Sequence, residues 1–299
     1  MGLVSFSSLM DNAERHQYAV GYFESWNMES LLAVADAAEA ERSPVILGFS
    51  GISLPNPGRS RPEHLEEYAA MGKAVAERLS MPACLLFNEC ASMEWIARAG
   101  RLGFGLLMFS DDECDPRQLL EQTRNVARLA HEAAAAAEGE PDALPGIAGN
   151  LVSAPARQRL TDPQAAKVFA RETGIDCLAV NVGQAHLHGK EQVRLHLDRL
   201  EEIHAAVDIP LALHGATSLS WDDLREGVRR GVRKVNVGSV LKRTFFETLR
   251  ASCQAIGSAY NPYEVLGSGL PRDVLQTARE ALARVVREYM RVLGSAGRG

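Results

Sequence analysis

Apolar residues fall along the chain in two alternating patterns. Short, nearly continuous apolar runs of strand length lie at 44–49, 83–87, 105–109, 177–182, 210–214 and 234–237. Between them, apolar residues recur every three or four positions, which predicts helices at 30–42, 62–79, 92–102, 116–138, 162–173, 193–206, 221–231 and 241–255. Strands that alternate with helices in this way are typical of a parallel sheet with helical crossovers.

Two further segments bring the predicted strands to eight. One lies at 18–23, and the other at 146–151, where Pro, Gly and Asn interrupt the pattern. Eight strands in 299 residues, with no break in composition, predict one α/β domain over residues 1–299 that folds as a (β/α)8 TIM barrel. Asp115-Pro116 and Asp162-Pro163 each combine an N-cap acceptor with a proline that suits a first helical turn. Long loops are expected at 138–155 and 257–271.

Candidate chemistry is sought where each predicted strand ends, because barrel enzymes react at the carboxyl ends of their strands. Two such ends carry histidines, His186 and His188 in one and His214 in the other. Neutral imidazoles on neighbouring strands are good ligands for Zn²⁺ or a similar metal, although a single histidine also commonly caps or bonds a neighbour.

Two carboxylates at other strand ends, Glu24 and Glu89, are candidates to complete such a site. Two histidines and a glutamate form a known catalytic zinc set that leaves one position open for substrate. Equally, each glutamate can instead form an ion pair with an Arg or Lys at the carboxyl-end opening of the barrel. Cys90 is either a soft ligand or a small buried hydrophobic residue.

Small residues after the late strands indicate phosphate recognition. Segments 215–218 and 236–239 expose backbone N–H groups just before predicted helices, and helix N-termini attract anions. The predicted phosphate-binding residues, from these segments and other strand ends, are Ser50, Gly183, Lys190, Gly215, Thr217, Ser218, Asn236 and Ser239.

The amino-acid composition limits the classes of partner and the cellular compartment that can be expected. Thirty-two Lys and Arg residues are dispersed among 38 Asp and Glu residues, for a formal charge of −6, which argues against nucleic acid as a partner. Five cysteines without a CxxC pair indicate reduced thiols, so we expect a cytoplasmic protein. No apolar run approaches the ~18 to 20 residues needed to span a membrane.

The same segments carry a family resemblance that extends from the first residues to the last. Segments 18–23, 37–39 and 43–46, then 176–180, 210–215 and 234–237, and finally 271–273 and 290–297 resemble class II fructose- and tagatose-bisphosphate aldolases. This resemblance implies a lyase of carbohydrate metabolism in which a divalent metal, usually zinc, polarises the carbonyl of a ketose phosphate. It also implies a homodimer or higher homo-oligomer, with Arg272 reaching a neighbour's phosphate pocket.

By that resemblance the metal ligands are His214 and either His186 or His188. His186 keeps the spacing from Gly183 and is preferred, whereas His188 keeps the Gly-Lys that follows. Glu89 stands where the family has a zinc histidine, and Asn88 stands where it has the catalytic aspartate. The family's glutamate ligand before the long loop has no clear counterpart, since the matching region, residues 142–146, contains no glutamate.

Further departures occur at Gly238, which replaces an aspartate, and at Glu24, which lies in a motif that is Asn-rich in the family. Because an amide cannot exchange a proton near neutral pH, Asn88 cannot serve as an acid or base, and ordinary fructose-bisphosphate aldolase activity is not expected. Three hypotheses follow. The first is a metal-dependent lyase in which His186, His214 and Glu89 hold the metal and Glu24 is the acid or base. The second is a sugar-phosphate isomerase or epimerase, and the third is a non-catalytic phosphate-binding or accessory subunit.

Overall fold

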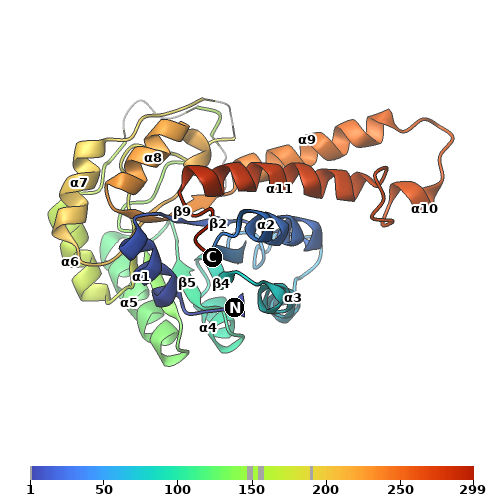
Figure 1. Cartoon of the computed structure of the whole chain (residues 1–299). Helices are drawn as coiled ribbons and strands as arrows, with labels where there is room; N and C mark the ends of the chain where they lie inside the picture. Colours follow the sequence, from blue (N-terminus) through green and yellow to red (C-terminus); the bar gives the residue numbers. More distant parts are fainter. Residues whose placement is uncertain (1, 147–150, 154–157, 189–190) are drawn as a thin grey trace.

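The computed structural model describes residues 2–146, 151–153, 158–188 and 191–299 as a barrel of parallel strands surrounded by helices (Figure 1). The strands are β1 (Gly2–Leu3), β2 (Val20–Phe23), β3 (Val45–Ser50), β4 (Pro82–Cys90), β5 (Leu106–Phe109), β6 (Ala136–Gly139), β7 (Cys177–Ala179), β8 (Leu211–Leu213) and β9 (Val232–Val237). The helices are α1 (Phe6–His16), α2 (Met28–Glu41), α3 (Leu65–Arg78), α4 (Met93–Arg101), α5 (Pro116–Glu132), α6 (Pro163–Thr173), α7 (Leu197–Ala206), η2 (Ala216–Ser218), α8 (Trp221–Arg229), α9 (Ser239–Ala255), α10 (Pro262–Val265) and α11 (Val274–Val292).

Strands β2 to β9 close into the barrel that the sequence predicted. Their order is β4-β3-β2-β9-β8-β7-β6-β5, all neighbours are parallel, and pairing of β4 with β5 closes the ring. The short β1 adds to the beginning of β4, where Gly2 pairs with Pro82. The (β/α)8 fold class is therefore confirmed.

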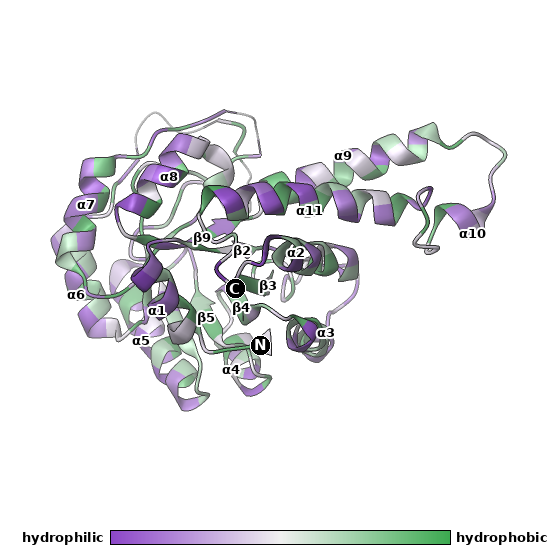
Figure 2. Ribbon diagram, viewed as in Figure 1, coloured by the Kyte–Doolittle hydropathy of each residue, from purple (hydrophilic) through white to green (hydrophobic). Residues whose placement is uncertain are grey.

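The barrel interior is apolar along most of its length and becomes polar at the carboxyl ends of the strands. Val20, Ile46, Leu86 and Met108 belong to the inner buried cluster. The outer faces of the strands are buried against the helices, and β5 is green in Figure 2 while the outer helices mix green and purple. Strands buried on both faces give continuous apolar runs, which explains why the sequence located most of them correctly.

The prediction for the segment after α5 was wrong. Helix α5 ends at Glu132, and not at residue 138, because Ala134 adopts a left-handed conformation (φ 57°) that turns the chain into β6. The missing strand is therefore Ala136–Gly139 and not 146–151. Residues 147–150 of the predicted strand lie outside the described residues, and Leu151 makes an isolated bridge with Leu187. Small side chains let β6 fit between β5 and β7, which overrides the helical preference of the alanine run.

Other predicted features agree with the structure. Asp115 and Asp162 cap α5 and α6, each with proline at the helix start. The predicted loop 257–271 contains the short helix α10. Within the described residues, no helix has both the length and the apolar character that crossing a bilayer requires.

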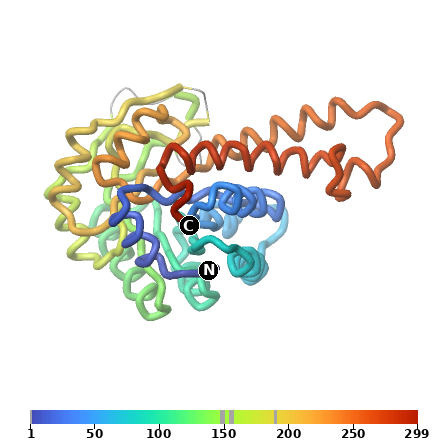
Figure 3. The backbone as a smooth tube through the Cα atoms, in the orientation of Figure 1, coloured from blue at the N-terminus to red at the C-terminus, as the bar shows by residue number. Residues whose placement is uncertain are grey.

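Helices α9 and α11 run side by side and extend beyond the barrel as an arm, with α10 near its tip (Figures 1 and 3). The two chain ends lie near the amino-terminal ends of the barrel strands. Gly2 N–H donates to the Leu79 carbonyl, and Gly299 N–H donates to the Arg42 carbonyl just before β3. The carboxyl-end face is left for the candidate site.

Candidate active site

Strand β4 brings two consecutive polar residues, Asn88 and Glu89, to the same cavity. In a regular strand they would point to opposite faces. Here the register with β5 shifts between Phe87 and Cys90, and Glu89 adopts a left-handed conformation with φ 56°. Bulges of this kind redirect side chains and are common beside active sites. Both residues therefore line the main cavity at the mouth of the barrel.

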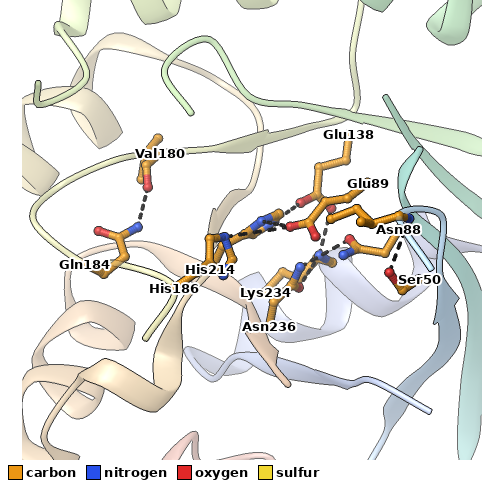
Figure 4. A network of polar contacts seen from close by, with 11 residues as sticks. Ser50, Asn88, Glu89, Glu138, Val180, Gln184, His186, His214, Lys234 and Asn236 are labelled. Atoms are coloured by element: carbon orange, nitrogen blue, oxygen red, sulfur yellow. Dashed lines mark hydrogen bonds and ion pairs between the residues drawn. The ribbon is translucent and has the colours of Figure 1, made fainter. Parts of the chain in front are cut away.

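His214 follows β8 and is completely buried between two carboxylates (Figure 4). Its Nδ1 lies 2.9 Å from Oε1 of Glu89, and its Nε2 lies 2.7 Å from Oε1 of Glu138. The other oxygen of Glu138 forms a buried ion pair with Lys234 of β9, with Nζ and Oε2 2.8 Å apart. The charged side chains of these four residues thus contact one another in the order Glu89, His214, Glu138 and Lys234. We call them the buried charge cluster.

The charges within this cluster balance. Burial alone would lower the pKa of His214, but its bonds to Glu138 and Glu89 outweigh burial and raise the pKa to about 10. Burial would raise the pKa of Glu89, yet the bond to His214 and the nearby cations lower it to about 2. The pKa of Glu138 is also lowered, because Lys234 and His214 outweigh burial. Two carboxylates therefore face an imidazolium and an ammonium, as buried charges require.

His186 approaches the same glutamate from the loop after β7. Its Nε2 is 4.0 Å from Oε1 of Glu89, too far for a hydrogen bond, and its ring centroid is 6.4 Å from that of His214. Burial, its largest influence, lowers the pKa of His186, so this imidazole is neutral and keeps a lone pair.

Glu89, His186 and His214 can hold a divalent metal ion. Each offers one ligand atom, and these atoms all lie within 4.8 Å of one another. Two imidazoles and a carboxylate are a donor set that catalytic metal sites use. The carboxylate of Glu138 on the second nitrogen of His214 is also typical, since metal-bound histidines usually donate their other N–H to an acceptor. The residues present therefore fit a divalent metal.

The opposite part of the cavity is formed by the start of α9 and the η2 turn. Gly215, Thr217, Gly238 and Ser239 line it, together with Lys242 from the first turn of α9. The N-terminus of this 17-residue helix presents the positive end of its dipole, and the Val240 N–H in its first turn donates to Oγ1 of Thr217. We call the five lining residues the anion cradle.

Glu24 lies against this cradle. Its Oε1 is 2.6 Å from Nζ of Lys242, and a Cβ added at Gly238 would lie 2.8 Å from its Oε2. A larger residue at position 238 would therefore require the Glu24 carboxylate to move. The glycine at 238 and the glutamate at 24 fit each other sterically.

The structure brings nine of the predicted site residues to the main cavity, and they are Glu24, Ser50, Asn88, Glu89, His186, Gly215, Thr217, Asn236 and Ser239. Four others lie elsewhere. Ser218 is buried and bonds the backbone of Gly215 and Ala185, Gly183 adopts φ 113° beside Arg194, His188 is exposed, and Arg272 pairs with Glu264 on the arm. Lys190 lies outside the described residues.

Sequence reasoning missed five residues of this region, namely Tyr22, Glu138, Glu140, Lys234 and Lys242. Glu138 was hidden at the end of the overextended helix and Glu140 in the loop predicted at 138–155, although their alternation with Gly139 has the period of a strand. Glu140 is buried beside Glu89 and His186 in a smaller adjoining cavity, and burial raises its pKa to about 8. Lys234 was assigned to a strand without regard to its charge, and that charge inside an apolar run was the available signal.

Comparison with known proteins gives a consistent result over the whole chain. The family described as fructose-bisphosphate aldolase class-II matches residues 4–298. The YdjI aldolase of Escherichia coli K12 has a similar structure, with TM-score 0.78 and 24% identity over 99% of this chain and 98% of that one. A putative fructose-1,6-biphosphate aldolase from Coccidioides immitis gives TM-score 0.81 and 24% identity over 98% and 96%. Fructose-bisphosphate aldolase from Campylobacter jejuni gives 0.79 and 18% over 100% and 97%.

Proposed function

Because the chain belongs to the class-II fructose-bisphosphate aldolase family, we propose that it is a metal-dependent lyase that cleaves or forms a C–C bond in a ketose phosphate or related keto sugar. One observation carries the proposal. Glu89 and His186, whose ligand atoms lie within 4.8 Å of the buried His214, line the same cavity as the anion cradle at the start of α9. A substrate with a carbonyl at one end and a phosphate at the other matches that pair of features.

The metal would be held by Glu89, His186 and His214, and nitrogen and carboxylate donors favour zinc. Once bound, a divalent cation supplies Lewis-acid polarisation of a substrate carbonyl. Glu138 fixes the orientation of the His214 ring through a 2.7 Å contact. The cradle of Gly215, Thr217, Gly238, Ser239 and Lys242 would bind the phosphate through backbone N–H groups, hydroxyls and the ammonium.

Proton transfer in this proposal falls to Glu24, with Glu140 as the second candidate. The Asn88 amide can hydrogen-bond a substrate oxygen but cannot exchange a proton near neutral pH. Glu24 lines the cavity. Glu140 lies beside Glu89 and His186, and its raised pKa of about 8 keeps it protonated at neutral pH. The variants Glu24→Gln and Glu140→Gln distinguish the two candidates. Only the variant that lacks the proton-transferring carboxyl should lose about 100-fold or more in kcat.

Elemental analysis and turnover test the proposal together. Purified protein should contain about one zinc or similar ion per chain and should condense dihydroxyacetone phosphate with one or more aldehydes from a panel. His214→Ala should lose the metal and the activity, whereas His16→Ala, which changes an exposed histidine at the end of α1, should keep both. Metal-free wild-type protein together with unchanged turnover in His214→Ala would refute the mechanism.

Enolisation without C–C cleavage is the second candidate function, because it would use the same metal-ligating residues and phosphate site, whereas the amide at Asn88 is the main argument for a non-catalytic subunit. An isomerase or epimerase would exchange substrate C–H protons with solvent deuterium but release no fragment. Exchange into larger ketose phosphates without release of a fragment, followed by NMR, separates the two reactions, because an aldolase also exchanges the proton that it removes from dihydroxyacetone phosphate. Binding of phosphate ligands with neither exchange nor cleavage under any metal would instead indicate the accessory subunit.

We further propose a homo-oligomer in which the arm packs against a second copy of the chain. Exposed apolar residues concentrate there, with Tyr263 86% exposed, Phe246 61% and Leu266 59%. Patches of this kind usually mark interaction surfaces. Arg272 lies on the same arm and would reach the partner's phosphate pocket. Tyr263→Glu should lower the mass measured by sedimentation, and an unchanged mass would count against this interface.

A further inference from the structure

Tyr22 lies on the inner face of β2, at the level of the candidate active site. It is directly paired in register with Asn236 of β9 and is only 2% exposed. It belongs to the inner apolar cluster of the barrel but also lines the main cavity beside Asn88 and Glu89. Tyr22 is therefore at the boundary between the packed core and the cavity.

The phenol oxygen of Tyr22 is buried and has no hydrogen-bond partner among the described residues. A buried hydroxyl without a partner is destabilising relative to a phenylalanine of the same shape. The ring already has a packing role, because Nζ of Lys234 lies 5.6 Å from its centroid. Packing thus accounts for the ring but not for the oxygen.

The surroundings of this oxygen indicate what it can bind. Burial raises the pKa of Tyr22, and the charges of Glu24, Glu89 and Glu138 raise it further, so the phenol keeps its proton. It is therefore a hydrogen-bond donor at neutral pH. None of those three carboxylates accepts from it, since Glu24 pairs with Lys242 and the other two bond His214.

We propose that the Tyr22 hydroxyl contacts the substrate and donates a hydrogen bond to an oxygen of the ketose phosphate, next to Asn88 on the floor of the cavity. This inference rests on the proposed function, because it requires an oxygen-rich ligand that extends from the anion cradle towards the metal-ligating group. Inorganic phosphate would occupy the cradle alone and would not reach Tyr22. The hydroxyl is thus a specificity determinant for the part of the substrate beyond the phosphate.

The test compares Tyr22→Phe with Tyr18→Phe in metal-loaded protein. Tyr18 is a matched control, because it is also buried in the inner cluster but donates to Oδ1 of Asn12 at 3.0 Å, away from the cavity. Calorimetry measures binding of two probes, dihydroxyacetone phosphate and inorganic phosphate. Tyr22→Phe should weaken dihydroxyacetone phosphate about 5- to 10-fold, as expected for one lost hydrogen bond, and leave inorganic phosphate unchanged. Tyr18→Phe should change neither.

Thermal unfolding without ligand adds a second readout. Tyr22→Phe should be as stable as the wild type or more stable, whereas Tyr18→Phe should unfold at a lower temperature because it loses a bonded hydroxyl. Equal binding of dihydroxyacetone phosphate by Tyr22→Phe and wild type would overturn the inference, as would equal weakening of both probes. A clear loss of stability in Tyr22→Phe would also overturn it, because the hydroxyl would then have a partner within the protein. Failure of the wild type to bind dihydroxyacetone phosphate is a different result, since it refutes the proposed function and removes the ligand that Tyr22 needs.

Discussion

Raising the pH of the metal-free protein should destabilise it by removing the proton from His214. In the folded chain this imidazolium lies between Glu89 and Glu138, and its pKa is raised from 6.5 to about 10. A group whose pKa is raised by folding stabilises the protein fully below its unfolded pKa and loses that contribution as the pH rises to its folded pKa. The relevant window therefore runs from about pH 6.5 to pH 10.

The size of the effect follows from the difference between the two pKa values. A difference of about 3.5 pH units corresponds to an upper limit of about 5 kcal/mol, lost at about 1.4 kcal/mol per pH unit. Between pH 7 and pH 8.5 the contribution of His214 to the free energy of unfolding should thus fall by about 2 kcal/mol, and deprotonation of Glu140, whose pKa is raised to about 8, should add to this fall. Ionisation of the buried thiols contributes little to the change in stability between pH 7 and pH 8.5. An unfolded thiol titrates near 9, and burial raises the pKa of Cys84 and Cys90 to about 12 in the folded chain.

Urea unfolding in EDTA at several pH values measures this slope. His214→Gln should be less stable at pH 7, since it leaves two buried carboxylates without their imidazolium, but it should have a shallower slope, keeping the part that comes from Glu140, whose pKa is raised to about 8. His131→Gln, at a partly exposed histidine that contacts Asp176 on the surface, serves as the control and should keep the wild-type slope. Equal slopes in the wild type and His214→Gln would refute the assignment of the proton to His214.

Three further predictions concern the same residues. Glu138→Gln leaves the buried Lys234 ammonium without its counter-charge and should lower the free energy of unfolding by about 3 to 5 kcal/mol, measured by urea titration. Zinc must displace the His214 proton, so its apparent Kd should fall about 100-fold from pH 6 to pH 8, and calorimetry in buffers of different ionisation enthalpy should detect the released proton. Glu24→Gln frees Lys242 and removes a negative charge beside the cradle, so inorganic phosphate should bind about 3- to 10-fold tighter in calorimetry. Weaker phosphate binding would contradict this role for Glu24.

The barrel was predictable because its strands are buried on both faces. Segments such as 45–49 and Leu106–Phe109 lack polar side chains, and helices between them leave few alternative topologies. Strand Ala136–Gly139 was not predictable in the same way. Five consecutive alanines precede Glu138, and alanine is the best helix former, so local preference and tertiary structure disagree there.

The same error hid part of the site. With 116–138 taken as helix, neither Glu138 nor Glu140 could be assigned to a strand end, and only the pairing of β6 with β5 and β7 reveals them. Glu89 and His214 were expected at a common mouth, but their direct contact depends on a left-handed glutamate within β4. Non-glycine residues rarely adopt that conformation, so no local pattern predicts it.

A glutamate at position 89, where the resemblance implies a histidine, changes the charge of the whole cluster. An imidazole there would leave Glu138 to balance both the His214 imidazolium and the Lys234 ammonium, whereas Glu89 restores neutrality. The same extra negative charge remains when a divalent cation takes the place of the His214 proton, so the centre is one unit less positive than a centre of three imidazoles. A less positive centre polarises a carbonyl less strongly and attracts a phosphate less strongly. Under the proposed function, the hydrogen-bond donors that line the cavity, above all the Tyr22 hydroxyl and the Lys242 ammonium, would then contribute a larger share of the recognition of substrate oxygens.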